Sequence, residues 1–183
     1  MHSETVRYVL VDSSLGRLLV ATTDRSVCLV AFGESDAELV QEVTRRFPRA
    51  TIELAEGESL DWVAAVVELI ADPAGPNASA AARIPLDMRG TDFQRQVWTA
   101  LREIPRGRTV TYSQLAATIG RPTATRAVAS ACGANPLAVI VPCHRVIGAD
   151  GSLTGYRWGL ERKRMLLDRE GAPLGTGVAP TGP

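Results

Sequence analysis

Cys143 and His144 stand side by side after a proline, and this pair has the residue types that nucleophilic chemistry requires. Thiolate is the nucleophilic form of cysteine, and a neighbouring base or cation raises its fraction near neutral pH. Adjacent side chains of a strand point to opposite faces, so contact between the two needs a turn or a bridging water. On this dipeptide alone, a buried structural cysteine beside a surface histidine stays an open alternative.

The three cysteines, Cys28, Cys132 and Cys143, are an odd number at wide spacings. This argues against a disulfide framework and for a reducing compartment. With two histidines, His2 and His144, and no Cys-x-x-Cys pair, the sequence contains no zinc constellation. We therefore expect no metal site and no other cofactor.

Size and composition indicate a soluble globular protein that can bury a real core: 183 residues, 45% hydrophobic and 22% charged. No stretch approaches the roughly 20 apolar residues that cross a bilayer. The polar segment Met1–Asp12 does not have the pattern of a signal peptide. We expect a cytoplasmic protein without a membrane partner.

Charge is balanced overall but divided along the chain. Residues 1–88 hold 7 arginines against 14 acidic residues, whereas residues 89–170 hold 13 basic residues against 6 acidic ones. A split of this size suggests that the second half faces a polyanion such as nucleic acid. Drift of charge on solvated faces explains the split equally well when charge is the only argument.

The first half predicts an antiparallel meander followed by helices. Turn residues separate three short runs of strand character, at Val6–Val11, Arg17–Thr22 and Ser26–Phe32. Two amphipathic helices are predicted, over Ser35–Phe47, with the serine as its cap, and over Ser59–Ile70. Ala71–Ala82 reads as a linker, and Arg83–Met88 predicts one more strand.

The second half predicts a helix over Thr91–Ile104 and then a helix-turn-helix. Ser113 is placed to cap its first helix, Gln114–Ile119, and a Gly-Arg-Pro turn leads to the second, Thr123–Ala134. The second helix carries Arg126 near its N-terminal end, where recognition helices contact DNA, and its other residues there are small. A tightly packed pair of core helices is the competing interpretation.

The apolar run Leu137–Val141 predicts a buried strand that leads to Cys143, and a last helix is predicted to end near Glu170. The tail is rich in Gly, Pro, Ala and Thr, a composition that favours disorder. The chain therefore divides into residues 1–88, residues 89–170 and a tail, 171–183.

Ordered motifs extend through residues 90–170: Gly90-Thr91-Asp92-Phe93-Gln94, Val97-Trp98, Ile104-Pro105-x-Gly107, Thr111-Tyr112-Ser113-Gln114-Leu115-Ala116, Arg126-Ala127-Val128, Asn135-Pro136, Pro142-Cys143-His144-Arg145-Val146 and Gly155-Tyr156. In content and spacing they resemble the catalytic domain of the O6-alkylguanine-DNA alkyltransferases, or methylated-DNA–protein-cysteine methyltransferases. Ala129–Cys132 and Tyr156–Gly159 are most similar to the C-terminal half of the bacterial adaptive-response protein. The first half resembles, more loosely, the ribonuclease-H-like domain that precedes this catalytic domain.

The resemblance implies an α+β fold, with a ribonuclease-H-like antiparallel sheet and helices over residues 1–88 and a mainly helical, winged-helix-like domain over residues 89–170. It implies a monomer that acts on double-stranded DNA containing O6-alkylguanine, and on O4-alkylthymine. The alkyl group would pass irreversibly to Cys143, so that each molecule acts once.

The resemblance also implies the roles of individual residues. Cys143 matches the alkyl acceptor, His144 the base that draws its proton through a water, and Glu170 the carboxylate that orients this base. Tyr112 matches the hydroxyl that hydrogen-bonds guanine N3. Asn135 matches the residue that holds the turn before the cysteine.

The DNA contacts follow from the same match. Arg126 corresponds to the arginine that enters the base stack in place of the rotated nucleotide, and Thr125, Ala127 and Ser130 share its helix, which is expected in the minor groove. The base pocket would be lined by the backbone of Val146 and by the region of Tyr156 and Arg157.

Two features depart from the family pattern. Arg106 and Arg108 flank Gly107 where acidic or neutral residues are usual, which would alter loop or DNA contacts. No four-cysteine zinc module precedes the catalytic region, so the resemblance implies a stand-alone repair protein. The alternatives are a non-catalytic alkyl-lesion DNA-binding protein, a cysteine hydrolase, for which no oxyanion hole is visible, and a helix-turn-helix regulator.

Overall fold

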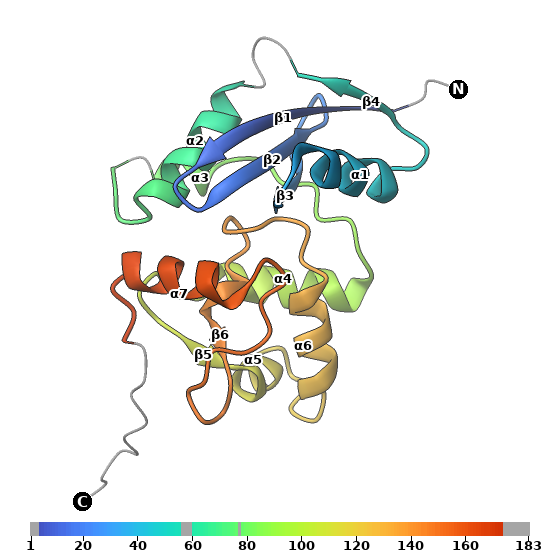
Figure 1. Cartoon of the computed structure of the whole chain (residues 1–183). Helices are drawn as coiled ribbons and strands as arrows, with labels where there is room; N and C mark the ends of the chain where they lie inside the picture. The colour runs from blue at the N-terminus through green and yellow to red at the C-terminus, as the bar shows by residue number, and fades with distance from the viewer. Residues whose placement is uncertain (1–3, 56–59, 77, 174–183) are drawn as a thin grey trace, which may run out of the picture.

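The first half of the chain is built on a four-stranded sheet in the computed structural model, which describes residues 4–55, 60–76 and 78–173. Strands β1 (Thr5–Ser13), β2 (Gly16–Thr22) and β3 (Val27–Phe32) form the expected antiparallel meander (Figure 1). The sequence analysis did not predict β4 (Thr51–Leu54), which pairs parallel to β1. Three of its four residues are exposed, so the alternation that marks a half-buried strand is missing.

Alternate residues of the strands face two separate cores, as the two-residue period of a strand requires. One face packs on α1 (Asp36–Arg46), which Ser35 caps as predicted, and buries Leu19, Ala21, Leu29, Leu39 and Val43. The other face packs on α2 (Leu60–Ala71) and on the second half, and buries Leu18, Val20, Val30, Val66 and Ile70. The predicted start of the second helix, Ser59, lies outside the described residues, and the linker contains a short helix, α3 (Ala78–Ala81).

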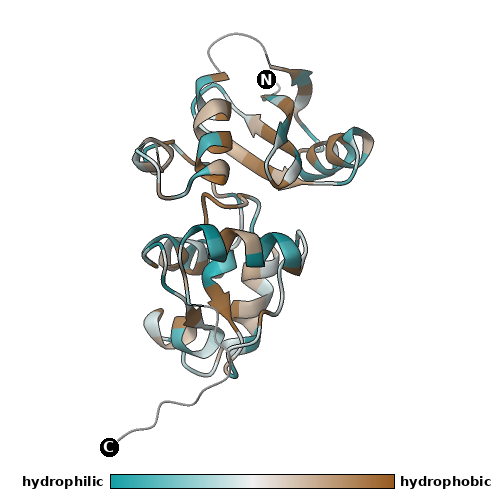
Figure 2. Cartoon of the chain, turned by 60° about the vertical axis from the view of Figure 1, so that its left-hand side comes forward, coloured by the Kyte–Doolittle hydropathy of each residue, from teal (hydrophilic) through white to brown (hydrophobic). Residues whose placement is uncertain are grey.

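The second half is mainly helical, as expected (Figure 2). Its elements are α4 (Asp92–Arg102), β5 (Val110–Thr111), α5 (Tyr112–Thr118), α6 (Thr125–Gly133), β6 (Val146–Ile147) and α7 (Leu160–Arg169). Helices α5 and α6 are the predicted helix-turn-helix, and the short parallel pair β5–β6 lies beside them. The cap of α5 is Thr111, whose side chain accepts from Gln114 N, so the assignment of Ser113 was wrong.

The open edge of β3 is covered by two segments that were predicted as strands. Arg83–Met88 and Leu137–Val141 each make only an isolated bridge to it, so both predictions were wrong. Pro136 O accepts from Val30 N at 2.9 Å, and Ala138 N donates to Val30 O at 3.0 Å. A short apolar run can be buried as a succession of turns as well as a strand, and this one docks the approach to Cys143 onto the sheet.

Part of the charge split is satisfied inside the molecule. Within the described part of the chain, arginines of the second half pair with acidic residues of the first in four ion pairs: Arg89 with Glu4 and with Asp87, Arg157 with Glu42 and Arg162 with Glu34. The asymmetry along the sequence therefore does not measure the charge of the free surface. Among the described residues, no helix is long and apolar enough to span a membrane.

The predicted division at residue 88 stays a prediction, although the sheet and helices α1–α3 all lie before it and α4–α7 after it. The tail prediction concerns residues 171–183, of which 174–183 lie outside the described residues.

Candidate active site

Cys143 begins a single turn of 3-10 helix, η2 (Cys143–Arg145), directly after Pro142. The sequence predicted a strand here, in which the side chains of Cys143 and His144 would point to opposite faces. The structure has a helical turn instead, so this restriction does not apply. Cys143 is 4% exposed and His144 is fully buried. The pair is therefore part of the core, which excludes the alternative of a surface histidine.

Asn135 organises the chain that leads into η2. Its side-chain oxygen accepts from Leu137 N at 2.9 Å, and its Nδ2 donates to Val141 O at 2.8 Å. The same Nδ2 lies 3.2 Å from Cys143 Sγ and donates a hydrogen bond to it. Val139, inside this stretch, has a φ of +68°, a value that β-branched residues rarely adopt. Asn135 thus holds both a strained turn and the sulfur.

His144 is fixed by a carboxylate from the end of α7. Its Nε2 lies 2.8 Å from Glu170 Oε1, and the side chain of Glu170 is 1% exposed. Burial would raise the pKa of Glu170, but hydrogen bonds from His144 and Arg145 outweigh it and hold the pKa at about 2. An ionised carboxylate only accepts hydrogen bonds, so Nε2 carries the proton and Nδ1 is a bare acceptor.

Nδ1 of His144 is buried and has no hydrogen-bond partner among the described residues. Burial lowers the pKa of His144, against the opposing hydrogen bond to Glu170, so the imidazole is neutral near pH 7. A neutral imidazole with a free Nδ1 can accept a proton. Burial also raises the pKa of the Cys143 thiol to about 11, although the hydrogen bond from Asn135 opposes this, so the thiol needs such a base.

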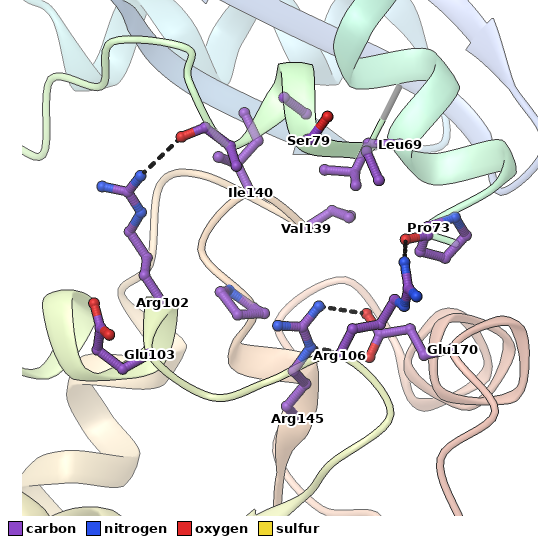
Figure 3. A pocket seen from close by; sticks show the side chains of 14 residues that line it. Leu69, Pro73, Ser79, Arg102, Glu103, Arg106, Val139, Ile140, Arg145 and Glu170 are labelled. Atoms are coloured by element: carbon purple, nitrogen blue, oxygen red, sulfur yellow. Dashed lines mark hydrogen bonds and ion pairs between the residues drawn. The ribbon is translucent and has the colours of Figure 1, made fainter. Parts of the chain in front are cut away.

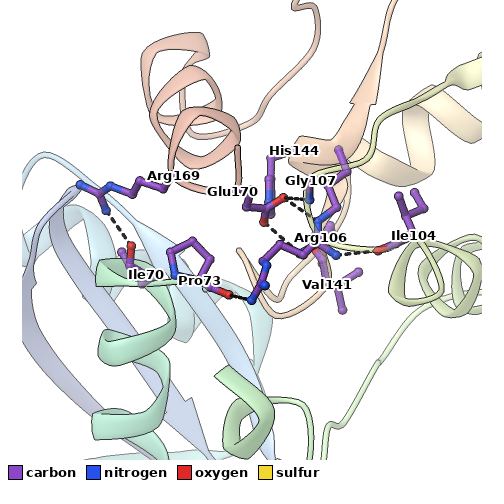
Figure 4. Close-up of polar contacts among 11 residues, drawn as sticks. Ile70, Pro73, Ile104, Arg106, Gly107, Val141, His144, Arg169 and Glu170 are labelled. Carbon is purple, nitrogen blue, oxygen red and sulfur yellow. Dashed lines mark hydrogen bonds and ion pairs between the residues drawn. The ribbon is translucent and has the colours of Figure 1, made fainter. Parts of the chain in front are cut away.

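Glu170 has more partners than the sequence analysis assigned (Figure 4). Arg145 donates to it through Nε and one terminal nitrogen, both at 2.9 Å, and Gly107 N donates at 3.4 Å. Arg145 also donates to Ile104 O at 2.6 Å. Its place in the Pro-Cys-His-Arg motif was visible, but no sequence signal linked it to a carboxylate 25 residues away.

Tyr112, at the start of α5, reaches towards the loop before Tyr156. Its hydroxyl donates to Thr154 O at 3.0 Å and to Gly155 O at 3.3 Å. Burial raises the pKa of Tyr112 to about 12, so it is a hydrogen-bond donor at neutral pH. Gly155 has a φ of +61°, and a Cβ there would lie 3.0 Å from the Tyr112 hydroxyl oxygen, so glycine meets both demands.

Lys163 is a buried residue that the sequence analysis left without a role. Its ammonium donates to Val146 O and, at 2.7 Å, to Thr154 O, and the residue is fully buried. It therefore ties the strand after η2 to the loop that Tyr112 contacts. The available signal was that it is the only lysine among 20 basic residues. A compact ammonium fits between two carbonyls where a planar guanidinium does not.

Of the three residues predicted to line a base pocket, two are buried in the second half, and the side chain of the third points to the first half. Val146 is fully buried, and Tyr156 is 7% exposed with a hydroxyl that has no partner among the described residues. The side chain of Arg157 instead extends to Glu42 of α1, with an N–O distance of 2.5 Å. The prediction for Arg157 therefore concerns its backbone at most.

The predicted DNA contacts lie along α6. Arg126, Ala127 and Ser130 are exposed and Thr125 is half-buried. Trp98 Nε1 of α4 donates to Ala131 O at 2.8 Å on the opposite, buried side of α6. The helix thus packs one face on the core and leaves a face of small residues with one arginine in solvent.

A cavity of about 470 Å³ lies between the two halves, on the Glu170 side of the site (Figure 3). Its walls include Leu69 and Pro73 of the first half and Ile140, Arg145 and Glu170 of the second. Cys143 and Tyr112 are not among its lining residues. Since Val146, Tyr156 and Arg157 do not line it either, this cavity is not the predicted base pocket.

Two family models match the chain. The 6-O-methylguanine DNA methyltransferase ribonuclease-like domain matches residues 6–68, and the 6-O-methylguanine DNA methyltransferase DNA binding domain matches residues 92–172.

Curated relatives and solved structures agree with these matches. The chain is 50% identical over 165 residues to the bifunctional transcriptional activator/DNA repair enzyme Ada of Escherichia coli K12, covering 90% of this chain and 45% of that protein. It is 42% identical over 165 residues to the methylated-DNA–protein-cysteine methyltransferase of Mycolicibacterium paratuberculosis, covering 90% and 92%. The chain spans about half the length of the first curated relatives it matches. The crystal structure of Mycobacterium tuberculosis OGT in complex with DNA superposes with a TM-score of 0.69 and 38% identity, covering 91% of this chain and 95% of that one.

Proposed function

This chain belongs to the 6-O-methylguanine DNA methyltransferase family, and we propose that it repairs DNA by moving the alkyl group of O6-alkylguanine to Sγ of its own Cys143. One observation carries the proposal: a buried thiol shares one helical turn with a neutral imidazole whose Nε2 is held by an ionised carboxylate and whose Nδ1 is free. This is the arrangement of a nucleophile, its base and the group that orients the base.

The proposed reaction begins with the thiol proton, which passes through a bridging water to Nδ1 of His144. Glu170 stays ionised and stabilises the imidazolium that results. The thiolate then attacks the alkyl carbon, so that an S–C bond forms, the C–O6 bond breaks and its electron pair remains on the guanine. The Tyr112 hydroxyl leaves Thr154 O and hydrogen-bonds guanine N3, which stabilises the departing anion. No step regenerates the thiol, so each molecule acts once.

The exposed face of α6 is the proposed DNA contact. Small residues there allow the close approach that a minor groove requires, and extrusion of the damaged base costs a few kcal/mol. Arg126 has no side-chain partner among the described residues, so its guanidinium is available to fill the space that the base leaves. The planar cation can stack on neighbouring bases. O4-alkylthymine would reach Cys143 by the same route.

The decisive experiment is peptide mass spectrometry after incubation with a short duplex that contains one O6-methylguanine. We expect a methyl adduct on the peptide with Cys143, in an amount equal to the guanine repaired, and none on the peptides with Cys28 or Cys132. Cys143→Ala should bind the duplex and yield no adduct. Tight binding without an adduct on the unaltered protein would refute the proposal and favour a lesion-binding protein, an alternative that the methyltransferase names of the relatives do not favour.

We also propose that the protein acts in the cytoplasm as a monomer. Its three cysteines are unpaired and buried, which suits a reducing compartment. Cell fractionation and sedimentation, with and without DNA, test the two statements separately.

A further inference from the structure

The C-terminal end of α2 receives two arginines from the second half of the chain (Figure 4). Arg169 donates to Ile70 O, in the last turn of α2, at 2.6 Å, and Arg106 donates at 2.7 Å to Pro73 O, two residues after the last residue of the helix, Ala71. The last carbonyls of a helix have no partner inside it and form the negative end of its dipole, so cations are stabilised there. The last turn of α2 contains no basic residue of its own.

Each of these arginines directly precedes a residue of the active site. Arg169 precedes Glu170, and Arg106 precedes Gly107, whose N–H donates to the Glu170 carboxylate. Arg169 also donates to Ser14 Oγ at 2.8 Å, in the turn between β1 and β2. Two segments therefore determine the position of the Glu170 carboxylate: the end of α7 and the loop that contains Gly107. An arginine in each segment binds the first half of the chain.

We propose that Arg106 and Arg169 are positioning residues: Arg169 binds a carbonyl of the last turn of α2, Arg106 binds one in the turn that follows it, and together they keep Glu170 in hydrogen-bond contact with His144. The inference rests on the proposed function, because it concerns the proton transfer in that reaction. A misplacement of about 1 Å near reacting groups can cost up to about a hundredfold in rate. Arg106, which departs from the family pattern, thus has a role within the molecule that does not involve DNA.

Two variants test the proposal, and the chain offers a matched control for each. Arg106→Gln and Arg169→Gln remove the anchors. Arg108→Gln, on the same loop as Arg106, and Arg164→Gln, on α7, change exposed arginines that have no side-chain partner among the described residues. Methyl iodide, which needs no DNA contact, serves as the electrophile, and peptide mass spectrometry gives the rate at Cys143.

We expect each anchor variant to methylate Cys143 about tenfold more slowly at pH 7 than the unaltered protein. The rates should converge towards pH 11, where the thiol ionises without a base. The charged groups that face His144 are Glu170, Arg145 and Lys163, and those that face the Cys143 thiol are Lys163 and Arg157, with Tyr112 nearby. All are retained in every variant, and Lys163, whose pKa burial lowers to about 8, loses its charge within this pH range in all of them alike. A change in the pH profile therefore reports the position of Glu170 and not its charge.

The ring of His144 supplies a second readout, because the chain has only one other histidine, His2. Nitrogen-15 shifts should identify the Nε2–H tautomer in the unaltered protein and a mixture of tautomers in the anchor variants. An arginine that only stabilised the junction between the halves would lower the melting temperature without changing the tautomer.

Anchor variants that match Arg108→Gln and Arg164→Gln in both readouts would overturn the proposal. If a glutamine variant does not fold, the methionine variant, which has a side chain of similar length and no donor, is measured instead, and the same two readouts decide. If the unaltered protein transfers no methyl group from the duplex, the proposed function fails. The methyl iodide rates and the His144 tautomer still decide on the anchors in that case.

Discussion

Methylation of Cys143 is expected to destabilise the protein, because the reaction adds a methyl group to a sulfur that is buried and accepts a hydrogen bond. Cys143 is 4% exposed, and Asn135 Nδ2 donates to its sulfur at 3.2 Å. A thioether carries a methyl group where the thiol carried a proton, so we expect the methyl group to press on the atoms around the sulfur. Asn135 cannot retreat freely, since it also bonds Leu137 N and Val141 O.

The magnitude follows from two contributions. Placing an extra methyl group in a well-packed interior costs about 1–3 kcal/mol. Weakening the bond from Asn135 to sulfur costs about 1 kcal/mol more. The total, about 2–4 kcal/mol, is a large part of the roughly 5–15 kcal/mol by which a domain is stable. For a chain of this length it corresponds to a decrease in Tm of roughly 5–15 °C.

The assay compares thermal unfolding of the same preparation before and after reaction with methylated duplex, followed by circular dichroism once the DNA is removed. Duplex without the lesion is the control for DNA exposure, and Cys143→Ala, treated in parallel, controls for methylation elsewhere. An unchanged or higher Tm in protein that carries the adduct would show that the pocket accommodates the methyl group, which would refute the packing argument.

Three further predictions concern other parts of the site. Arg126→Ala should slow repair of duplex DNA about tenfold or more and leave the reaction with free O6-benzylguanine unchanged; equal losses on both substrates would exclude a role in the base stack. Tyr112→Phe should slow transfer about tenfold at unchanged duplex affinity, and an unchanged single-turnover rate would exclude the contact with N3. Glu170 has a pKa of about 2 in place of its ordinary 4.5, so its stabilising contribution is complete above pH 4.5 and is lost as the pH falls towards 2. Urea unfolding should therefore show a smaller loss of stability between pH 5 and pH 3 for Glu170→Gln than for the unaltered protein; parallel losses would contradict the pKa.

Local patterns predicted the elements that have strong local signals. The meander β1–β3, the helix capped by Ser35 and the helix-turn-helix α5–α6 all follow from alternation, caps and turn residues. The wrong predictions concern segments whose local pattern is weak, or whose composition suits more than one kind of structure. Strand β4 is short and exposed, and Leu137–Val141 has the composition of a strand but forms turns, because Asn135 supplies the hydrogen bonds that a neighbouring strand would otherwise supply.

The candidate site was predicted as a set of residues, and the structure brings its central members together. Asn135 is hydrogen-bonded to Cys143, and Glu170 to His144, whereas the side chain of Arg157 contacts Glu42. The roles of these residues remain proposals. The charge of each half of the sequence was a poor predictor of a DNA-binding surface. A count of arginines does not distinguish one that faces solvent from one that pairs with the other half of the chain.

The sequence by itself determined the chemical inventory and the family: a thiol beside an imidazole after proline, in a series of motifs at family spacing. These are properties of neighbouring residues, and a linear pattern records them. Only the tertiary structure decided which distant groups meet. Glu170 reaches His144 across 26 residues, and Lys163 is buried against two carbonyls. Arg169 binds a carbonyl of α2, and Arg106 binds one just after this helix. Such contacts depend on how the two halves pack, and packing is set by the summed burial of many side chains that no short motif encodes.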